Sequence, residues 1–164
     1  MPFALTAYEV FKALHIMAVV AAFGLPLSYP MLLPYVHRTN PRAMPALHDA
    51  QHRMIQRLVA PGTVLVLAFG AYLATKGHYW SKAWVDVPLA ILVVIGGVGG
   101  GYLAPRSEGA AAVARADVAA APADGAVAWS AEYERLYRGL MTAETALGIL
   151  VLVAIFFMAA KPFS

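Results

Sequence analysis

Long apolar stretches separated by charged connections dominate the chain. A transmembrane helix needs about 20 mostly apolar residues, and four stretches are long enough, at about 8–34, 57–75, 86–105 and 138–160. None of them alternates in polarity as the strands of a membrane barrel do. The pattern therefore predicts an all-α integral membrane protein, a single domain over residues 1–164 that folds as a bundle of four transmembrane helices.

The composition supports this prediction. Apolar residues make up 61% of the 164 residues and charged residues 13%, against about 45–50% and about 25% in soluble domains. A chain of this size has too little interior to bury such an excess, which argues against a soluble enzyme. A formal charge of +3 spread among apolar runs forms no basic patch for nucleic acid. Without cysteine there is no disulfide framework, thiolate zinc site or covalently attached c-type haem.

The two kinds of positive residue separate along the chain. The arginines all lie in the connections between the first and second and between the third and fourth stretches: Arg38, Arg42, Arg53, Arg57, Arg106, Arg115, Arg135 and Arg138. The lysines all lie on the opposite side: Lys12, Lys76, Lys82 and Lys161. Because positive charge is retained in the cytoplasm, the arginine side is predicted to be cytoplasmic and both termini to be outside.

Both arginine-containing connections have helical features. Residues 37–56 mix polar and apolar positions and predict a short interfacial helix or an early start of the second span. The alanine-rich segment after Arg106 favours helix, so the third and fourth spans are expected to extend into the cytoplasm. Ser130 is the predicted N-cap of the last helix, because its hydroxyl can accept a backbone N–H there.

Three prolines follow one another at four-residue spacing in the first span: Pro26, Pro30 and Pro34. Each lacks an N–H and clashes with the carbonyl four residues earlier. Two interpretations remain open, a kinked helix that opens a cavity and a bent helix that simply packs well.

A glycine-rich run in the third span contains two overlaid small-residue pairs, Gly96 with Gly100 and Gly97 with Gly101. Such pairs let helix backbones approach closely, within the bundle or with a second copy or another membrane partner. The face of Gly97 and Gly101 would also accept a flat porphyrin.

Few ionisable groups lie at membrane depth, where they are costly and often functional. His15, one turn after Lys12, is a candidate axial haem ligand or proton relay, or a histidine that is hydrogen-bonded to a neighbouring helix. Glu144 is expected to be protonated or paired with a cation. Its candidate partners are Arg38, Arg57 and Arg138.

The other histidine candidates lie on the cytoplasmic side. His48 and His52 share a helix face at i, i+4 spacing and, with His37, could bind a divalent metal. The pair lacks the glutamate of the zinc-protease motif, and a solvated membrane interface is the alternative interpretation.

Three stretches carry a family resemblance: KALHI at 12–16, RLVAPG at 57–62 and MAAKPF at 158–163. Together they resemble a bacterial family of predicted integral membrane proteins of unknown function. More distantly, the chain resembles the HemJ-type protoporphyrinogen oxidases and the copper-resistance D membrane domains. The resemblance implies a four-helix fold in the bacterial inner membrane and haem b bound through His15. The YVH of residues 35–37 is similar to the HemJ-type V-Y-H motif.

Departures from the HemJ pattern concern the residues tied to its activity. The family has an arginine where this chain has Met31, Leu32 or Leu33, and a lysine near the position of Pro88. Its N-E-x-P motif is reduced here to Glu144. If the chain is an enzyme, the resemblance implies a HemJ-like oxidoreductase, but no nucleophile–base or carboxylate pair supports catalysis.

The leading functional expectation is therefore a haem- or porphyrin-associated redox protein of the inner membrane, embedded in the lipid bilayer. Two alternatives stay open, a non-catalytic assembly subunit and a protein that handles a metal or a small solute.

Overall fold

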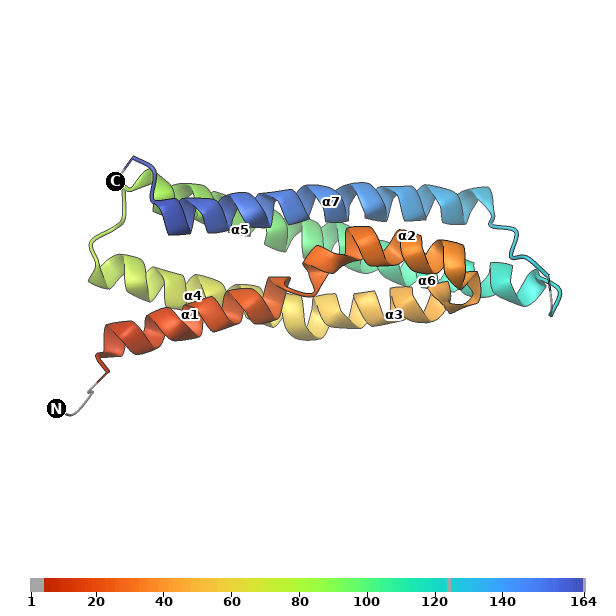
Figure 1. The fold of residues 1–164 in the computed structure, drawn as a ribbon, viewed down its shortest axis with the longest axis horizontal. Coiled ribbons are helices and arrows are strands. Elements are labelled where there is room, and N and C mark those ends of the chain that lie inside the picture. The colour runs from red at the N-terminus through yellow and green to blue at the C-terminus, as the bar shows by residue number, and fades with distance from the viewer. Residues whose placement is uncertain (1–4, 124, 164) are drawn as a thin grey trace.

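The computed structural model, which describes residues 5–123 and 125–163, consists of four long helical rods packed side by side (Figure 1). Each rod is long and apolar enough to cross a membrane, and no strand occurs among the described residues. The rods cover Ala7–Thr39, Pro41–Lys76, Ala83–Ala120 and Ala131–Ala160. The predicted all-α fold with four long apolar helices is confirmed, and every predicted stretch lies within one rod.

Three of the rods are interrupted, whereas the fourth is a single helix. The first consists of α1 (Ala7–Phe23), a 3₁₀ turn (Pro26–Ser28) and α2 (Tyr29–Thr39). The second consists of a 3₁₀ turn (Pro41–Ala43), α3 (Met44–Met54), the π-helical segment η3 (Ile55–Val59) and α4 (Ala60–Lys76). The third consists of α5 (Ala83–Val98), the π-helical segment η4 (Gly99–Leu103) and α6 (Ala104–Ala120). The fourth is α7 (Ala131–Ala160).

Helix α3 is the predicted early start of the second span, and α6 is the predicted helical extension of the third. The 30 residues of α7 extend about 45 Å at about 1.5 Å per residue. This exceeds the roughly 30 Å hydrocarbon core of a bilayer. The rods are therefore long enough to continue beyond the hydrocarbon region.

The predicted cap of the last helix is present. The Ser130 hydroxyl accepts the backbone N–H of Tyr133 at 3.2 Å. The Asp117 carboxylate on α6 in turn accepts both the N–H and the hydroxyl of Ser130, each at 2.9 Å. These bonds fix the start of α7 against the end of α6.

The bundle has two distinct ends. Both chain termini lie at one of them, which we call the terminal end; the other, which carries the α2–α3 and α6–α7 connections, we call the loop end (Figure 1). Helix α1 packs mainly on α4, α3 on α6, and α5 on α7. The arginines lie in α2, the 3₁₀ turn Pro41–Ala43, α3, η3, α6 and the first part of α7, and the lysines lie at the terminal end.

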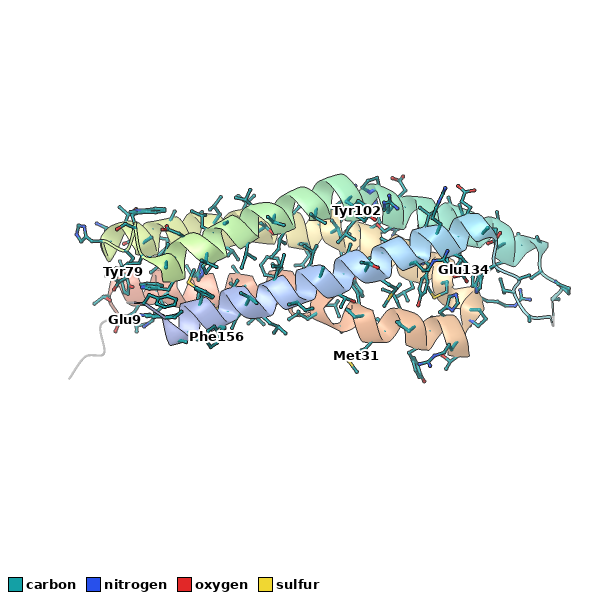
Figure 2. The ribbon with its side chains drawn as sticks, turned by 90° about the horizontal axis from the view of Figure 1, so that it is seen from above. Glu9, Met31, Tyr79, Tyr102, Glu134 and Phe156 are labelled. Carbon is teal, nitrogen blue, oxygen red and sulfur yellow. The ribbon has the colours of Figure 1, made fainter. Side chains whose placement is uncertain are left out.

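Large apolar side chains cover much of the outside of the bundle. Met31 is 81% exposed and points away from the bundle (Figure 2), and Val93 and Phe156 are also exposed. An apolar exterior of this extent is typical of helices that face lipid.

The close helix contacts do not occur where the glycine-rich run predicts them. At Gly62, an added Cβ would lie 2.6 Å from the Cβ of Ala22, so α1 and α4 approach closely there. An added Cβ at Gly97 or Gly101 would meet nothing within 4 Å. The expectation of close packing at Gly97 and Gly101 within the bundle is therefore wrong, because that face points outward. Its use by a second copy or another partner stays a prediction.

Candidate functional site

The three helix interruptions each accompany a proline. Pro26 begins the 3₁₀ turn of the first rod. In the second and third rods, η3 and η4 are each followed by an Ala-Pro pair, which places Pro61 and Pro105 in the first turn of the next α-helix. Proline lacks the N–H for an α-helical bond and crowds the preceding turn. A π-helical segment is one way in which a helix accommodates such a break, and π segments occur frequently at functional sites.

These interruptions surround one cavity in the middle of the bundle. Its volume is about 40 Å³, enough for about three water molecules at about 10–15 Å³ each. All four rods contribute to its walls. The lining residues are Phe23, Pro26, Leu27, Tyr29, Ile55, Val59, Ile95, Gly99, Leu103, Glu144, Leu147, Gly148 and Val151.

Glu144 is the acidic group of this cavity. Its side chain comes from α7 and is 5% exposed. The carboxylate oxygen Oε1 accepts a hydrogen bond of 2.6 Å from Nε2 of Gln51 on α3. The prediction of an arginine partner is wrong for the described residues, because the arginines named as candidates point outward and the amide of Gln51 takes their place. Buried charged groups in membrane helices mark ion pathways and proton relays.

A chain of buried polar side chains leads from Glu144 toward the loop end. Gln51 Oε1 lies 3.2 Å from His48 Nδ1, and His48 Nε2 lies 3.2 Å from the Tyr133 hydroxyl. Gln51, His48 and Tyr133 are each 0% exposed. Because buried polar groups are costly unless they are hydrogen-bonded, this chain fixes the relative positions of α3 and α7.

This row of hydrogen-bonded side chains ends in a cluster of aromatic rings at the loop end. The ring of Tyr133 stacks on Trp129 with centroids 4.1 Å apart, and His37 stacks on Tyr137 at 4.7 Å. His37 Nε2 is buried without a hydrogen bond, and Oε1 of Glu134 lies 3.9 Å away. The cluster therefore joins α2 to the first turns of α7.

The predicted metal ligands lie in different surroundings. His48 is fully buried, so its assignment to a solvated interface is wrong. The physical reason is that α3 packs along α6 and beside α7. His52 Nδ1 donates to the Ala104 carbonyl at 2.8 Å, which links α3 to α6. No group of three His, Asp or Glu side chains in the described part of the chain is arranged to hold a metal. A metal site at His37, His48 and His52 stays a prediction.

The predicted haem ligand lies near the terminal end. His15 is partly buried between α1 and α4, and its Nδ1 is 3.0 Å from the Val66 carbonyl. Lys12 is exposed one turn earlier. Neither residue contacts Gly97 or Gly101, since nothing lies within 4 Å of a Cβ built at either glycine.

A haem does not fit the cavity beside Glu144. Sites for ligands of that size occupy roughly 300–1,000 Å³, whereas this cavity has about 40 Å³ and does not include His15 in its walls.

Two members of the polar chain, Gln51 and Tyr133, were not predicted. Gln51 lies three residues after His48, which places both on one helix face. This spacing is the feature of the sequence from which Gln51 could have been predicted. Tyr133 resembles any interfacial aromatic residue in the sequence. The repeated Ala-Pro pair at Pro61 and Pro105 was a further signal, since both pairs follow a stretch that becomes π-helical.

Comparison of the chain with protein-family models, with curated proteins and with solved structures finds no match. The structure defines an all-helical protein whose four long apolar helices are compatible with a multi-pass membrane protein. The resemblance to the HemJ-type and copper-resistance D families stays a prediction.

Proposed function

We propose that this protein is a multi-pass membrane protein that handles protons, with Glu144 as the group that takes up and releases the proton. This falls closest to the metal- or small-solute-handling alternative that the sequence left open, and not to the leading expectation of a haem-associated redox protein. The site differs from the predicted one, because it lies in the middle of the bundle rather than at the cytoplasmic histidines.

The observation that carries the proposal is the convergence of three helix interruptions on one cavity that contains a buried carboxylate. Membrane transporters typically place coupling-ion sites at interrupted helices near the middle of the bilayer. A permanently charged carboxylate is energetically costly at this depth, and protonation removes that cost. The arrangement therefore favours reversible protonation of Glu144 over a purely structural role.

The arrangement of charges supports an orientation in the membrane. The arginines lie at the loop end and the lysines at the terminal end. Under the positive-inside rule, the loop end faces the cytoplasm and both termini lie outside, as in a bacterial inner-membrane protein.

Infrared difference spectroscopy of the protein in detergent or lipid tests the proposal. The exposed carboxyl groups give carboxylic acid bands that change with pH in every variant. A further band of this kind, from Glu144, is expected in the wild type and is expected to be absent in Glu144→Gln. Glu108→Gln, which changes an exposed glutamate of α6, is the matched control and should keep the band. A wild type without a titrating band that depends on Glu144 would refute the proposal.

Haem association is the second candidate, favoured by the position of His15. Its Nδ1 bonds to a backbone carbonyl, the usual way in which a ligating histidine is oriented with Nε2 left for the metal. Haem b bound there would supply one-electron redox chemistry, and His15 would hold it. The absorption spectrum after haem supplementation tests this. A Soret band lost in His15→Ala and kept in His78→Ala is expected, and no band in the wild type would refute it.

A further inference from the structure

The hydrogen bonds from Tyr133 to Glu144 all point in one direction. Gln51 Nε2 donates to Glu144 at 2.6 Å, which leaves Gln51 Oε1 to accept the N–H of His48 Nδ1. His48 Nε2 then has a lone pair and accepts the Tyr133 hydroxyl. The assigned donors thus run from Tyr133 through His48 and Gln51 to the carboxylate.

The side chains in this hydrogen-bonded row differ in whether they can transfer a proton. An imidazole can accept a proton at one nitrogen and release another from its second nitrogen, and a phenol can do the same through its single oxygen. A side-chain amide such as Gln51 has its donors on nitrogen and its acceptor on oxygen. Passing a proton through it would require the unstable imidic acid form. A proton on His48 therefore stops at Gln51.

The opposite side of Glu144 offers a different route. Gly148 and Val151, one and two turns further along α7 toward the terminal end, line the cavity together with Phe23 and Ile95. The cavity therefore extends from Glu144 toward the terminal end, and the polar chain extends toward the loop end. A volume of about 40 Å³ has room for about three waters at about 10–15 Å³ each. The Glu144 carboxyl group and the Tyr29 hydroxyl are the polar side-chain groups among the lining residues that can bind them, so this space is the route open to a proton of Glu144.

The same cavity suits a proton better than a metal cation. Hard cations such as calcium require about 6–8 oxygen ligands. The walls of this cavity are mostly apolar side chains, and one oxygen of Glu144 is already taken by Gln51. The site provides too few oxygen atoms to replace the hydration shell of a cation.

We infer that Gln51 is a positioning residue that seals Glu144 from the loop end, so that Glu144 exchanges its proton only through the cavity on the terminal side. The inference rests on the proposed proton uptake by Glu144. It adds the side of access and assigns Gln51 as the barrier.

Passive proton flux in lipid vesicles that contain an internal pH-sensitive dye tests the inference, with valinomycin and potassium to dissipate charge. The wild type is expected to show low flux, because access from one side alone does not connect the two solutions. Gln51→Glu replaces the amide with an isosteric carboxyl group that can pass a proton. This variant is expected to raise the flux several-fold.

Three variants make the result specific. Gln51→Met has similar length and cannot relay protons, so its flux should match the wild type. Gln51→Glu combined with Glu144→Gln should lose the added flux, because the path would no longer pass through Glu144. Gln51→His is a second relay variant with the same expectation, for use if Gln51→Glu does not fold.

Two outcomes would overturn the inference. One is a relay variant that folds but conducts no faster than Gln51→Met, and the other is added flux that persists without Glu144. If the Glu144 infrared band still titrates in either case, the proposed function stands and only the role of Gln51 is wrong. If the wild type shows no titrating band from Glu144, the proposed function itself is refuted.

Discussion

The amide of Gln51 and the carboxylate of Glu144 meet at 2.6 Å between α3 and α7, at the wall of the central cavity. Their pairing places an acidic group where the helices of the first three rods are interrupted. It also connects the middle of the bundle to the loop end through His48. The hydrogen bond therefore links two rods. It also separates the cavity on the terminal side of Glu144 from the polar side chains on its loop-end side.

Removing either partner alone is expected to be costly. Gln51→Met leaves the buried carboxylate without its donor, which costs about 1–3 kcal/mol of stability. Glu144→Met leaves the amide unpaired and has a similar cost. The double variant should lose less than the sum of the two, because the carboxylate and the amide that bond to each other are then both absent. The loss of the acceptor for His48 Nδ1 is common to Gln51→Met and the double variant. Thermal or denaturant unfolding in detergent measures the three free energies.

Gln56→Met is the control for this cycle, since Gln56 is exposed in η3. Surface substitutions of this kind usually change stability by less than about 0.5 kcal/mol. Additive effects of the two buried substitutions would show that Gln51 and Glu144 do not interact in the folded protein.

The sequence predicted the rods but not the partners within them. Apolar stretches define the spans because the bilayer requires about 20 apolar residues, and the Ser130 cap follows from local chemistry. The partner of Glu144 depends on the position of α3, which packs on α6 and reaches α7 through side-chain hydrogen bonds. The sequence left open a protonated Glu144 or an arginine partner, and the structure places the buried Gln51 beside it. Spacing within one helix does not determine which rod that helix packs against.

The glycines illustrate the same limit. A glycine-rich run indicates that a backbone can approach closely, but it does not show whether a neighbour is there. Gly62, isolated in the sequence, lies against Ala22, whereas Gly97 and Gly101 face outward. Tertiary packing, which the local pattern does not encode, decides between the two.

Gly62→Ala is therefore expected to destabilise the protein. The added methyl would lie 2.6 Å from the Ala22 Cβ, and relieving such overpacking costs about 1–3 kcal/mol. Gly97→Ala is the matched control, because its methyl meets nothing within 4 Å and alanine favours a helix by roughly 0.5–1 kcal/mol. Melting temperatures of the two variants in detergent should therefore shift in opposite directions. Equal destabilisation would contradict the close approach of α1 and α4.

The outward glycine face, formed by Gly97 and Gly101, can be tested as a contact surface for a second copy. If a second copy docks there, Gly97→Leu should abolish the cross-linked dimer in native membranes while leaving the monomer folded. A dimer that forms equally well in the variant would place any self-association elsewhere on the bundle.

Ser130→Ala should weaken the start of α7. The substitution removes the acceptor of the Tyr133 N–H and one of the two donors to Asp117. Loss of an N-cap typically costs about 0.5–2 kcal/mol. Hydrogen exchange should therefore accelerate at the Tyr133 amide, with little change in the middle of α7. Ser81→Ala, in the exposed α4–α5 connection, should leave both stability and exchange unchanged, and matching exchange at Tyr133 in the two variants would rule out the cap.

The orientation of the bundle can be tested by cysteine labelling, because the natural chain contains no cysteine. Ser81 lies in the connection at the terminal end, and Ala120 ends α6 at the loop end; both are exposed. Arginine is concentrated at the loop end and positive charge stays in the cytoplasm. A membrane-impermeant maleimide should therefore label Ser81→Cys in intact bacterial cells and Ala120→Cys only after permeabilisation. The reverse pattern would place both termini in the cytoplasm, and the terminal-side cavity that leads to Glu144 would then receive its protons from within the cell.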